Sequence, residues 1–324
     1  MSARASFAAI SPSESKEMYG EGMSIEEIAD RTGRSYTYIR NRLLDADTLL
    51  RSKASGTTLY ISRHPEWTRQ FIKCEVANPL ALTYDKLLLL TMVTTEGYTD
   101  STSFGFTNTQ EFLHRRYREL VRAVYGSVLI GRNRITSRTS STEIAHDISS
   151  LIPGKAFGER ALKAIQASPT LVADVLRIVA DTEGSMLISI RKAPRNYKVE
   201  CRVVLASSNA LFTRQLVKLL TSLDITSKPT SLGASIGTKA GISRFMSIVG
   251  FSAQARVIRK KGNESVWFGY KKSGLAKLFK RINQEQSLAR LSGMRGCFAD
   301  CATRSQIILR LKKWYEESNG GDVS

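Results

Sequence analysis

The chain has 324 residues, of which 42% are hydrophobic and 24% charged, so it is not an intrinsically disordered protein and has room for two or three domains with their own cores. Its 48 Lys and Arg against 29 Asp and Glu give a formal net charge of +19. A source with a basic proteome would also give such an excess. We favour a polyanionic partner, because phosphate contacts supply most non-specific affinity for nucleic acids.

Membrane insertion and a structural zinc site are both disfavoured by the sequence. Residues 1–10 lack the apolar core of a secretory signal, and no apolar run approaches the length needed to span a bilayer. Cys297 and Cys301 are spaced so that one helix face could carry both thiols, but no second Cys or His pair accompanies them. We expect a cytoplasmic protein with free thiols.

The N-terminal segment predicts three short helices. The first covers Glu14 to Tyr19, and the second begins at Ser24, where Glu27 completes a capping box. Gly33 then makes a turn, and Ser35 caps a basic helix that continues to Asp45. Helix, glycine turn and basic helix in this order indicate a helix-turn-helix, and the stretch resembles the modules of resolvases and many prokaryotic regulators.

In this domain, predicted for residues 1–61, four side chains on the outward face of the last helix are candidates for DNA contacts: Tyr36, Thr37, Arg40 and Asn41. The alternative is a three-helix module that contacts protein only. Leu59 to Ile61 predicts a short strand. Residues 62–79 are expected to form the linker, with a connecting helix over Trp67 to Val76.

One nine-residue pattern occurs twice in the rest of the chain, at 89–97 and at 176–184. Each copy is an apolar helix that ends in a carboxylate and a glycine, Glu96-Gly97 and Glu183-Gly184, and leads into a strand. A helix C-terminus carries partial negative charge, so a glutamate there is disfavoured unless a cation offsets it. Two such acids at one helix pair would form a site for a divalent metal. The repetition predicts an internal duplication.

The elements around each copy follow the same order. In the first repeat, residues 80–166, we predict a long helix capped by Asn108, a strand over Val128 to Thr136 and a helix over Thr142 to Leu151. In the second, residues 167–317, the predicted elements are strands at 186–190 and 197–206, a helix capped by Asn209, a hairpin over 226–241, and helices over 243–249 and 304–317. Residues 318–324 are expected to be disordered.

The duplicated body resembles the LAGLIDADG family of homing endonucleases in its single-chain, two-motif form. The resemblance implies an α+β fold in which a pseudo-twofold duplicated αββαββα saddle places two four-stranded sheets over DNA. It implies that the motif helices pack closely through small residues, here Thr91, Thr95, Ala180 and Thr182. It also implies that Glu96 and Glu183 are catalytic and bind Mg²⁺, each serving one DNA strand in a double-strand break.

The saddle strands supply further candidates for DNA contacts: Arg132, Arg134, Arg191, Lys198 and Arg202. The resemblance implies a basic residue near each acid, for which Lys198 and Lys239 are candidates. The chain departs from the family pattern where Arg177 and Ile178 replace small residues in the second motif helix, and where Thr94 stands in place of an inner acid.

Three functions are compatible with these features. The first is a monomeric, site-specific homing endonuclease that hydrolyses both strands of double-stranded DNA with Mg²⁺. The second is a non-catalytic DNA-binding regulator that combines a helix-turn-helix with a degenerate LAGLIDADG fold. The third is an intron RNA maturase, which uses the same fold and basic surface. Both acids are present, and this favours the enzyme.

Overall fold

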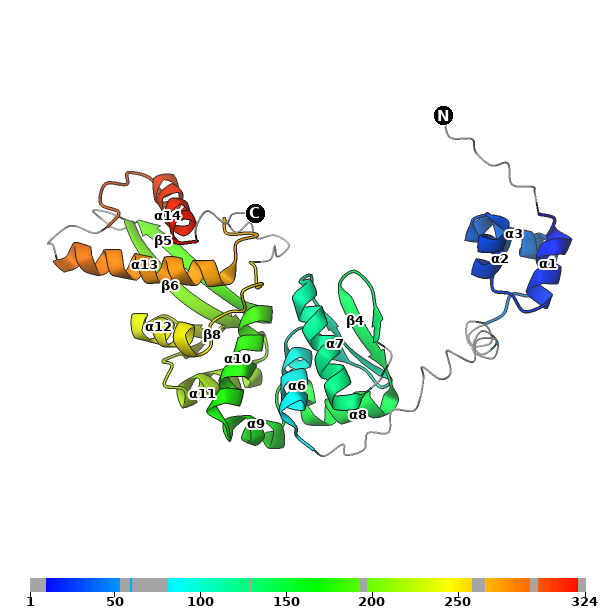
Figure 1. Cartoon of the computed structure of the whole chain (residues 1–324), viewed down its shortest axis with the longest axis horizontal. Helices are drawn as coiled ribbons and strands as arrows, with labels where there is room; N and C mark the ends of the chain where they lie inside the picture. Colours follow the sequence, from blue (N-terminus) through cyan, green and yellow to red (C-terminus); the bar gives the residue numbers. More distant parts are fainter. Residues whose placement is uncertain are drawn as a thin grey trace. The chain divides into compact units, whose positions relative to one another are not determined.

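The computed structural model describes residues 10–52, 59, 81–126, 128, 130–192, 197–257, 266–291 and 297–319. The chain divides into two compact units, Met1–Lys73 and Cys74–Ser324 (Figure 1). The linker predicted for 62–79 and the helix predicted for 67–76 lie outside the described residues. The strand predicted at Leu59 to Ile61 is wrong at its first position, where Leu59 is helical; its other two residues are not described.

The first unit is a three-helix module made of α1 (Pro12–Gly20), α2 (Ile25–Thr32) and α3 (Tyr36–Asp45). The capping box is confirmed: Ser24 Oγ accepts from the amide of Glu27, and the Glu27 carboxylate accepts from the amide of Ser24. Ser35 caps α3 by accepting from the amide of Tyr38. Ile28, Ile39 and Leu43 are fully buried in a small core of this unit.

The second unit consists of two repeats with the same order of elements. The first contains α6 (Tyr84–Glu96), β1 (Gly97–Thr99), β2 (Ser103–Thr107), α7 (Glu111–Tyr125), β3 (Ile130–Arg132), β4 (Thr136–Ser140) and α8 (Thr142–Leu151). The second, which follows α9 (Glu159–Gln166), contains α10 (Pro169–Glu183), β5 (Gly184–Lys192), β6 (Tyr197–Ala206), α11 (Ala210–Ser222), β7 (Lys228–Thr230), β8 (Gly233–Ile236) and α12 (Lys239–Ile248). The predicted duplication of αββαββα is confirmed.

Both sheets are antiparallel and four-stranded, ordered β1-β2-β4-β3 and β5-β6-β8-β7. Two helices, α13 (Lys272–Leu291) and α14 (Arg304–Asn319), follow the second repeat and pack on each other (Figure 1). Helix α14 continues two residues into the predicted disordered tail, and the remainder of that tail is not described. Cys297 and Cys301 are free and precede α14 in a turn, not on a helix. Within the described ranges, no helix has the length and apolarity to cross a membrane.

Helices α6 and α10 pack against each other between the two sheets (Figure 1). Thr91, Ala180 and Thr182 are buried, and the hydroxyls of Thr91 and Thr182 donate to carbonyls one turn earlier in their own helices. The large Arg177 does not separate the helices, because its guanidinium turns to the C-terminus of α12 and donates to the carbonyl of Val249 at 2.7 Å.

In the second unit, one predicted strand is wrong. The alternation over Val128 to Thr136 crosses a hairpin: β3 ends at Arg132, and β4 begins at Thr136. Asn133 makes the turn by accepting from the amides of Ile135 and Thr136 through its side chain, a role typical of asparagine. In the second repeat the predicted hairpin is confirmed as β7 and β8, while α12 begins four residues earlier than expected, at Lys239.

Candidate active site and nucleic-acid interface

Glu96 and Glu183 are the last residues of α6 and α10, and a glycine with extended backbone follows each. A Cβ atom on Gly97 would lie 2.4 Å from Val93 Cα, and one on Gly184 would lie 2.3 Å from the carbonyl oxygen of Ala180. Only glycine therefore allows the chain to pass from the helix end directly into a strand. This explains the repeated Glu-Gly pair in structural terms.

The two carboxylates lie at the same end of the helix pair. Tyr84, the first residue of α6, donates a hydrogen bond to Asp174 in the N-terminal half of α10. The helix starts therefore lie together, and Figure 1 shows both helices running toward the sheets in the same direction. Glu96 and Glu183 are each partly exposed. Both glutamates therefore end their helices on the side of the pair away from Tyr84 and Asp174.

Glu96 accepts a hydrogen bond from the side-chain amide of Asn108. Asn108 is thus not the predicted cap of α7: Gln110 occupies the N-cap position and makes no side-chain cap bond. The Asn108 main chain is itself fixed, because His114 Nε2 donates to its carbonyl at 2.7 Å while His114 Nδ1 accepts from Ser137 at 2.9 Å. Burial lowers the pKa of His114, which keeps the ring in this neutral form.

The partial negative charge at the C-terminal end of α10 is offset by Lys272, the first residue of α13. Its buried ammonium donates to the carbonyls of Ala180 and Asp181, both at 2.9 Å, in the last turn before Glu183. Asp181 in turn accepts from the amide of Ser252 at 2.9 Å and from its hydroxyl. Burial raises the pKa of Asp181. These contacts fix the loop after α12 to the end of α10.

The candidates Lys198 and Lys239 do not lie beside Glu183. Gly184 pairs with Leu205 at one end of β6, whereas Lys198 is seven residues away along the strand, or about 23 Å at 3.3 Å per residue. Lys239 lies near Lys198 and is held by Asn283 and Ser287 of α13. The lysine at the helix end is therefore Lys272. Local spacing gave no signal for it, because its partners are 91 and 92 positions away in the sequence.

Hydrogen bonds link the surroundings of the two acids. Asn108 accepts from the amide of Gln110 at 2.8 Å, and the Gln110 side chain accepts from the amide of Arg256 at 2.8 Å. Lys272, beside the second acid, donates from its amide to the carbonyl of Ala255 at 2.8 Å. The loop around Ala255 therefore connects the groups that contact Glu96 with those at the end of α10.

The pair of glutamates fits Mg²⁺ by the chemistry of its donors. Mg²⁺ prefers oxygen ligands and usually takes one or two carboxylates, completing its shell with waters and substrate phosphates. Among the described residues, no cluster of three or more His, Cys, Asp or Glu has the geometry of a metal site. The described residues thus offer no complete set of protein ligands around the two carboxylates.

The second sheet carries three of the predicted DNA contacts on one face. The register pairs Arg191 with Lys198, Ser189 with Glu200 and Leu187 with Arg202, so these side chains point the same way. The opposite face, with Val199 and Val203, packs into the core. Glu200 lies among the three cations, and the neighbouring Lys198 ammonium is the main cause of its lowered pKa.

In the first sheet, the structure corrects the set of candidates. Arg132 pairs with Ser137 on the face that α7 covers, and its guanidinium binds Glu111 of α7. Arg134 is exposed in the hairpin turn. Arg138, which the sequence did not single out, lies on the other face of the sheet between Gly105 and Gly131 and donates to Ser103 at 3.1 Å. The feature that could have identified Arg138 is its position in β4, where it alternates with the buried residues Ser137 and Thr139.

All four candidates in the helix-turn-helix unit, Tyr36, Thr37, Arg40 and Asn41, are exposed on α3. The opposite face of this helix, with Ile39 and Leu43, is buried. Tyr38 lies between the guanidinium groups of Arg34 and Arg42, whose carbons are 5.3 and 5.1 Å from the ring centroid. The exposed face of α3 is therefore basic and polar, as a phosphate or base contact requires.

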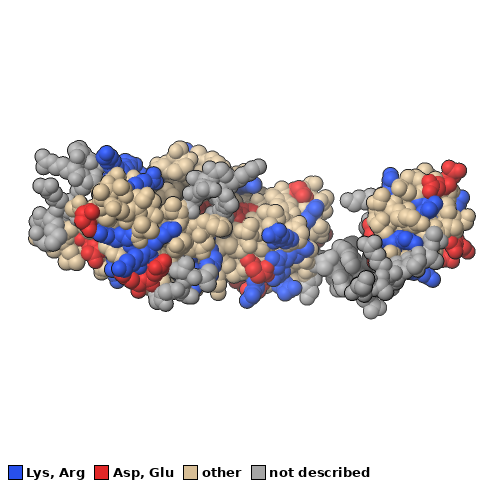
Figure 2. Space-filling view, turned by 90° about the horizontal axis from the view of Figure 1, so that it is seen from above, with Lys and Arg blue, Asp and Glu red and all other residues tan. Residues whose placement is uncertain are grey.

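Charged side chains are spread over the face that Figure 2 shows. Figure 2 shows Lys and Arg side chains in several patches, with carboxylates between them. The excess of basic residues is thus not confined to one segment.

Comparison with known proteins gives a family match for the N-terminal unit. Residues 9–58 match the family model described as "Helix-turn-helix domain". No curated protein matches the sequence.

Solved structures similar to this chain include LAGLIDADG domains. The N-terminal LAGLIDADG domain of DUF199/WhiA is 15% identical, with 60% of this chain and 92% of that chain covered and a TM-score of 0.34. Meganuclease I-SmaMI bound to uncleaveable DNA is 13% identical, with 63% of this chain and 92% of that chain covered and a TM-score of 0.36. LAGLIDADG meganuclease I-AabMI bound to uncleaved DNA is 12% identical, with 71% of this chain and 97% of that chain covered and a TM-score of 0.40. At these identities and TM-scores, the likeness supports no inference about chemistry.

Proposed function

We propose that this chain is a DNA endonuclease that makes Mg²⁺-dependent double-strand breaks at a specific site. The observation that supports the proposal is the position of Glu96 and Glu183, one from each repeat, at the same end of two packed helices. Two acids related by a duplication suit a substrate whose two strands are themselves related by symmetry. Each acid would serve one strand.

The roles of the residues follow from their contacts. Glu96 and Glu183 would hold the metal, and Asn108 orients Glu96 through its side-chain amide. Lys272 offsets the negative end of α10 beside Glu183. Bound Mg²⁺ would lower the pKa of an attacking water and stabilise the leaving oxygen. Arg138 and the cations around Glu200 would contact phosphates, and α3 of the helix-turn-helix would lengthen the recognised site.

A non-catalytic DNA-binding regulator is the second candidate. It is favoured by the helix-turn-helix unit, which by itself gives sequence recognition without any use for the glutamates. In that case Glu96 and Glu183 would be retained as helix ends, with Asn108 and Lys272 as their structural partners.

The test uses the full chain with a pool of duplexes selected for binding, in Mg²⁺ and in Ca²⁺. Cleavage of both strands in Mg²⁺ is expected. Glu96→Gln and Glu183→Gln are each expected to slow cleavage of a different strand by about 10²-fold or more, the loss typical when one electrostatic stabiliser is removed. Unchanged double-strand cleavage by either variant would disprove the site. Binding without cleavage in every metal would instead support the regulator, and selective binding of RNA would support a maturase.

A further inference from the structure

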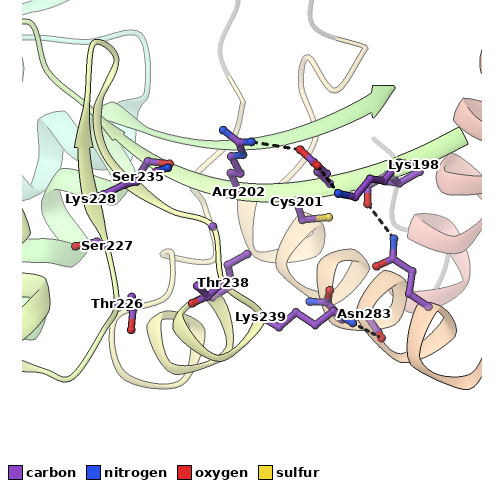
Figure 3. A pocket seen from close by; sticks show the side chains of 15 residues that line it. Lys198, Cys201, Arg202, Thr226, Ser227, Lys228, Ser235, Thr238, Lys239 and Asn283 are labelled. Carbon is purple, nitrogen blue, oxygen red and sulfur yellow. Dashed lines mark hydrogen bonds and ion pairs between the residues drawn. The ribbon is translucent and has the colours of Figure 1, made fainter. Parts of the chain in front are cut away.

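The outer half of β6 borders a pocket that the proposed active site does not use. Strand β8 pairs only with Val203 to Ala206 of β6, because the chain turns at Gly237 and enters α12. Among the described residues, no strand therefore pairs with residues 198–202 of β6 on that side. A pocket of about 460 Å³ lies there, bounded by the start of α12 and by α13 (Figure 3). This volume is within the range of small-molecule sites, about 300–1,000 Å³.

The pocket is basic. Among its described lining residues are four cations, Lys198, Arg202, Lys228 and Lys239, and one carboxylate, Glu200. Lys198 and Arg202 already bind that carboxylate, at 2.9 and 3.2 Å. In Figure 3, Lys239 lies on one side of the space and Lys228 on the other. Two further positive charges are thus available to an anion between them.

Neutral hydrogen-bonding groups complete the lining. The carbonyl of Val199 points to this edge and accepts from Gln286 at 2.9 Å, so by strand alternation the main-chain groups of Cys201 point the same way. The hydroxyl of Ser227 is buried there and has no hydrogen-bond partner within the described part of the chain. Such an arrangement costs stability unless a ligand or water satisfies it. Burial raises the pKa of the Cys201 thiol to about 12, so it remains protonated.

We propose that this pocket binds a nucleotide, with its phosphate between Lys228 and Lys239. The strand edge and Asn283 offer donors and acceptors to the base or sugar, and Val199 and Ile242 provide apolar surface. The nucleotide is either free or part of a DNA strand that extends past the end of the sheet. This inference does not depend on cleavage.

Gly237 allows a sharp test, because it lines the pocket and a Cβ added to it would meet only Arg202 Cγ, at 4.0 Å. Its φ is not in the left-handed region, so other residues are tolerated. Gly237→Leu should fill the pocket without changing charge, and Gly237→Ala is the matched control. Lys228→Gln with Lys239→Gln removes the phosphate contacts. Arg214→Gln with Lys218→Gln, both exposed on α11, removes the same two charges elsewhere.

Calorimetric titration of the full chain with thymidine 5′-monophosphate and with thymidine is the first arm, and binding of duplex DNA is the second. We expect Gly237→Leu and the double lysine variant to weaken nucleotide or duplex binding about tenfold or more, with both controls unchanged. If the variants bind thymidine 5′-monophosphate more weakly, the ligand is a free nucleotide. If they weaken only the binding of duplex DNA, the ligand is a nucleotide of the DNA strand. If all variants match the controls in both arms, the pocket does not bind nucleotides. Cleavage by Gly237→Leu is measured separately, so failure here is distinct from failure of the proposed nuclease.

Discussion

The two repeats present the same backbone at the glutamates but surround them with different chemistry. In the first repeat, a neutral amide, Asn108, contacts Glu96. In the second, the buried ammonium of Lys272 lies against the carbonyls that precede Glu183. Both repeats thus keep a glutamate followed by a glycine, and the path of the chain requires the glycine. The residues that stabilise the two helix ends are unrelated.

The helices also differ at their other end. Lys86 in α6 forms an ion pair with Asp147 of α8 at 2.7 Å, and Tyr125 donates to the same carboxylate at 2.7 Å; both charged side chains are 3% exposed. At the position in α10 that corresponds to Lys86, the second repeat has Ala173. The first repeat therefore depends on a buried charge pair that the second repeat replaced with apolar packing.

The largest expected effect comes from breaking that pair. Lys86→Met leaves Asp147 charged and buried, which should lower the free energy of unfolding by about 3–5 kcal/mol. Urea denaturation measures the loss. Lys163→Met, which removes an exposed ion pair with Glu159 in α9, should change it by no more than about 0.5 kcal/mol. Equal effects of the two variants would show that the buried pair contributes no more to stability than an exposed one.

A smaller effect should distinguish the two glutamates. Lys272→Met removes the donor to two buried carbonyls, which should cost about 1–3 kcal/mol of stability. Cleavage of the strand served by Glu183 should fall about 10–100-fold, while the other strand is unaffected, as measured on end-labelled duplexes. Lys280→Met, exposed on the same helix, is the control. Equal loss on both strands would show that Lys272 acts through global stability.

The stability of the protein should depend on pH through His114, a residue of the first repeat. Because burial lowers the pKa of His114 below the ordinary value of 6.5, the unfolded chain binds a proton as the pH falls through 6.5 and the folded chain does not. Stability should therefore fall below that pH, by about 1.4 kcal/mol for each pKa unit of lowering. His114→Gln should lose this dependence, while His146→Gln, at an exposed position on α8, should keep it. Denaturation midpoints between pH 5 and 8 provide the measurement.

The smallest expected effect concerns the faces of the first sheet. Arg138→Gln should reduce the slope of DNA affinity against salt by about one phosphate contact. Arg132→Gln, on the face covered by α7, should leave the slope unchanged. Fluorescence anisotropy at several salt concentrations measures both. If only Arg132→Gln reduced the slope, DNA would contact the face of the sheet that α7 covers.

Features that depend on local order were predictable from the sequence. The capping box at Ser24, the repeated Glu-Gly pair and the cap at Asn209 each involve residues within a few positions of one another, and all three are confirmed. The αββαββα order came from the resemblance to the LAGLIDADG family, because the residues of the first repeat alone predicted one strand where β3 and β4 form a hairpin.

The partners of the site were not predictable, because they meet only in three dimensions. Lys272 lies 92 positions after Ala180, and nothing in its own neighbourhood marks it as the cation at the end of α10. Asn108 resembles a helix cap in sequence, yet its amide is directed to Glu96. The sequence predicts a single strand that contains both Arg132 and Arg134, and the structure separates them because the chain turns at Asn133.

The hydrophobic core has a consequence for how this molecule can change. Side chains of both repeats and of α13 and α14 form one continuous core, while the three-helix unit has its own. Neither repeat can be lost or exchanged without exposing the apolar surface of the other, so the duplicated halves must be inherited together. Among the described residues, the core of the three-helix unit contains only side chains of that unit, so its own packing does not rely on either repeat.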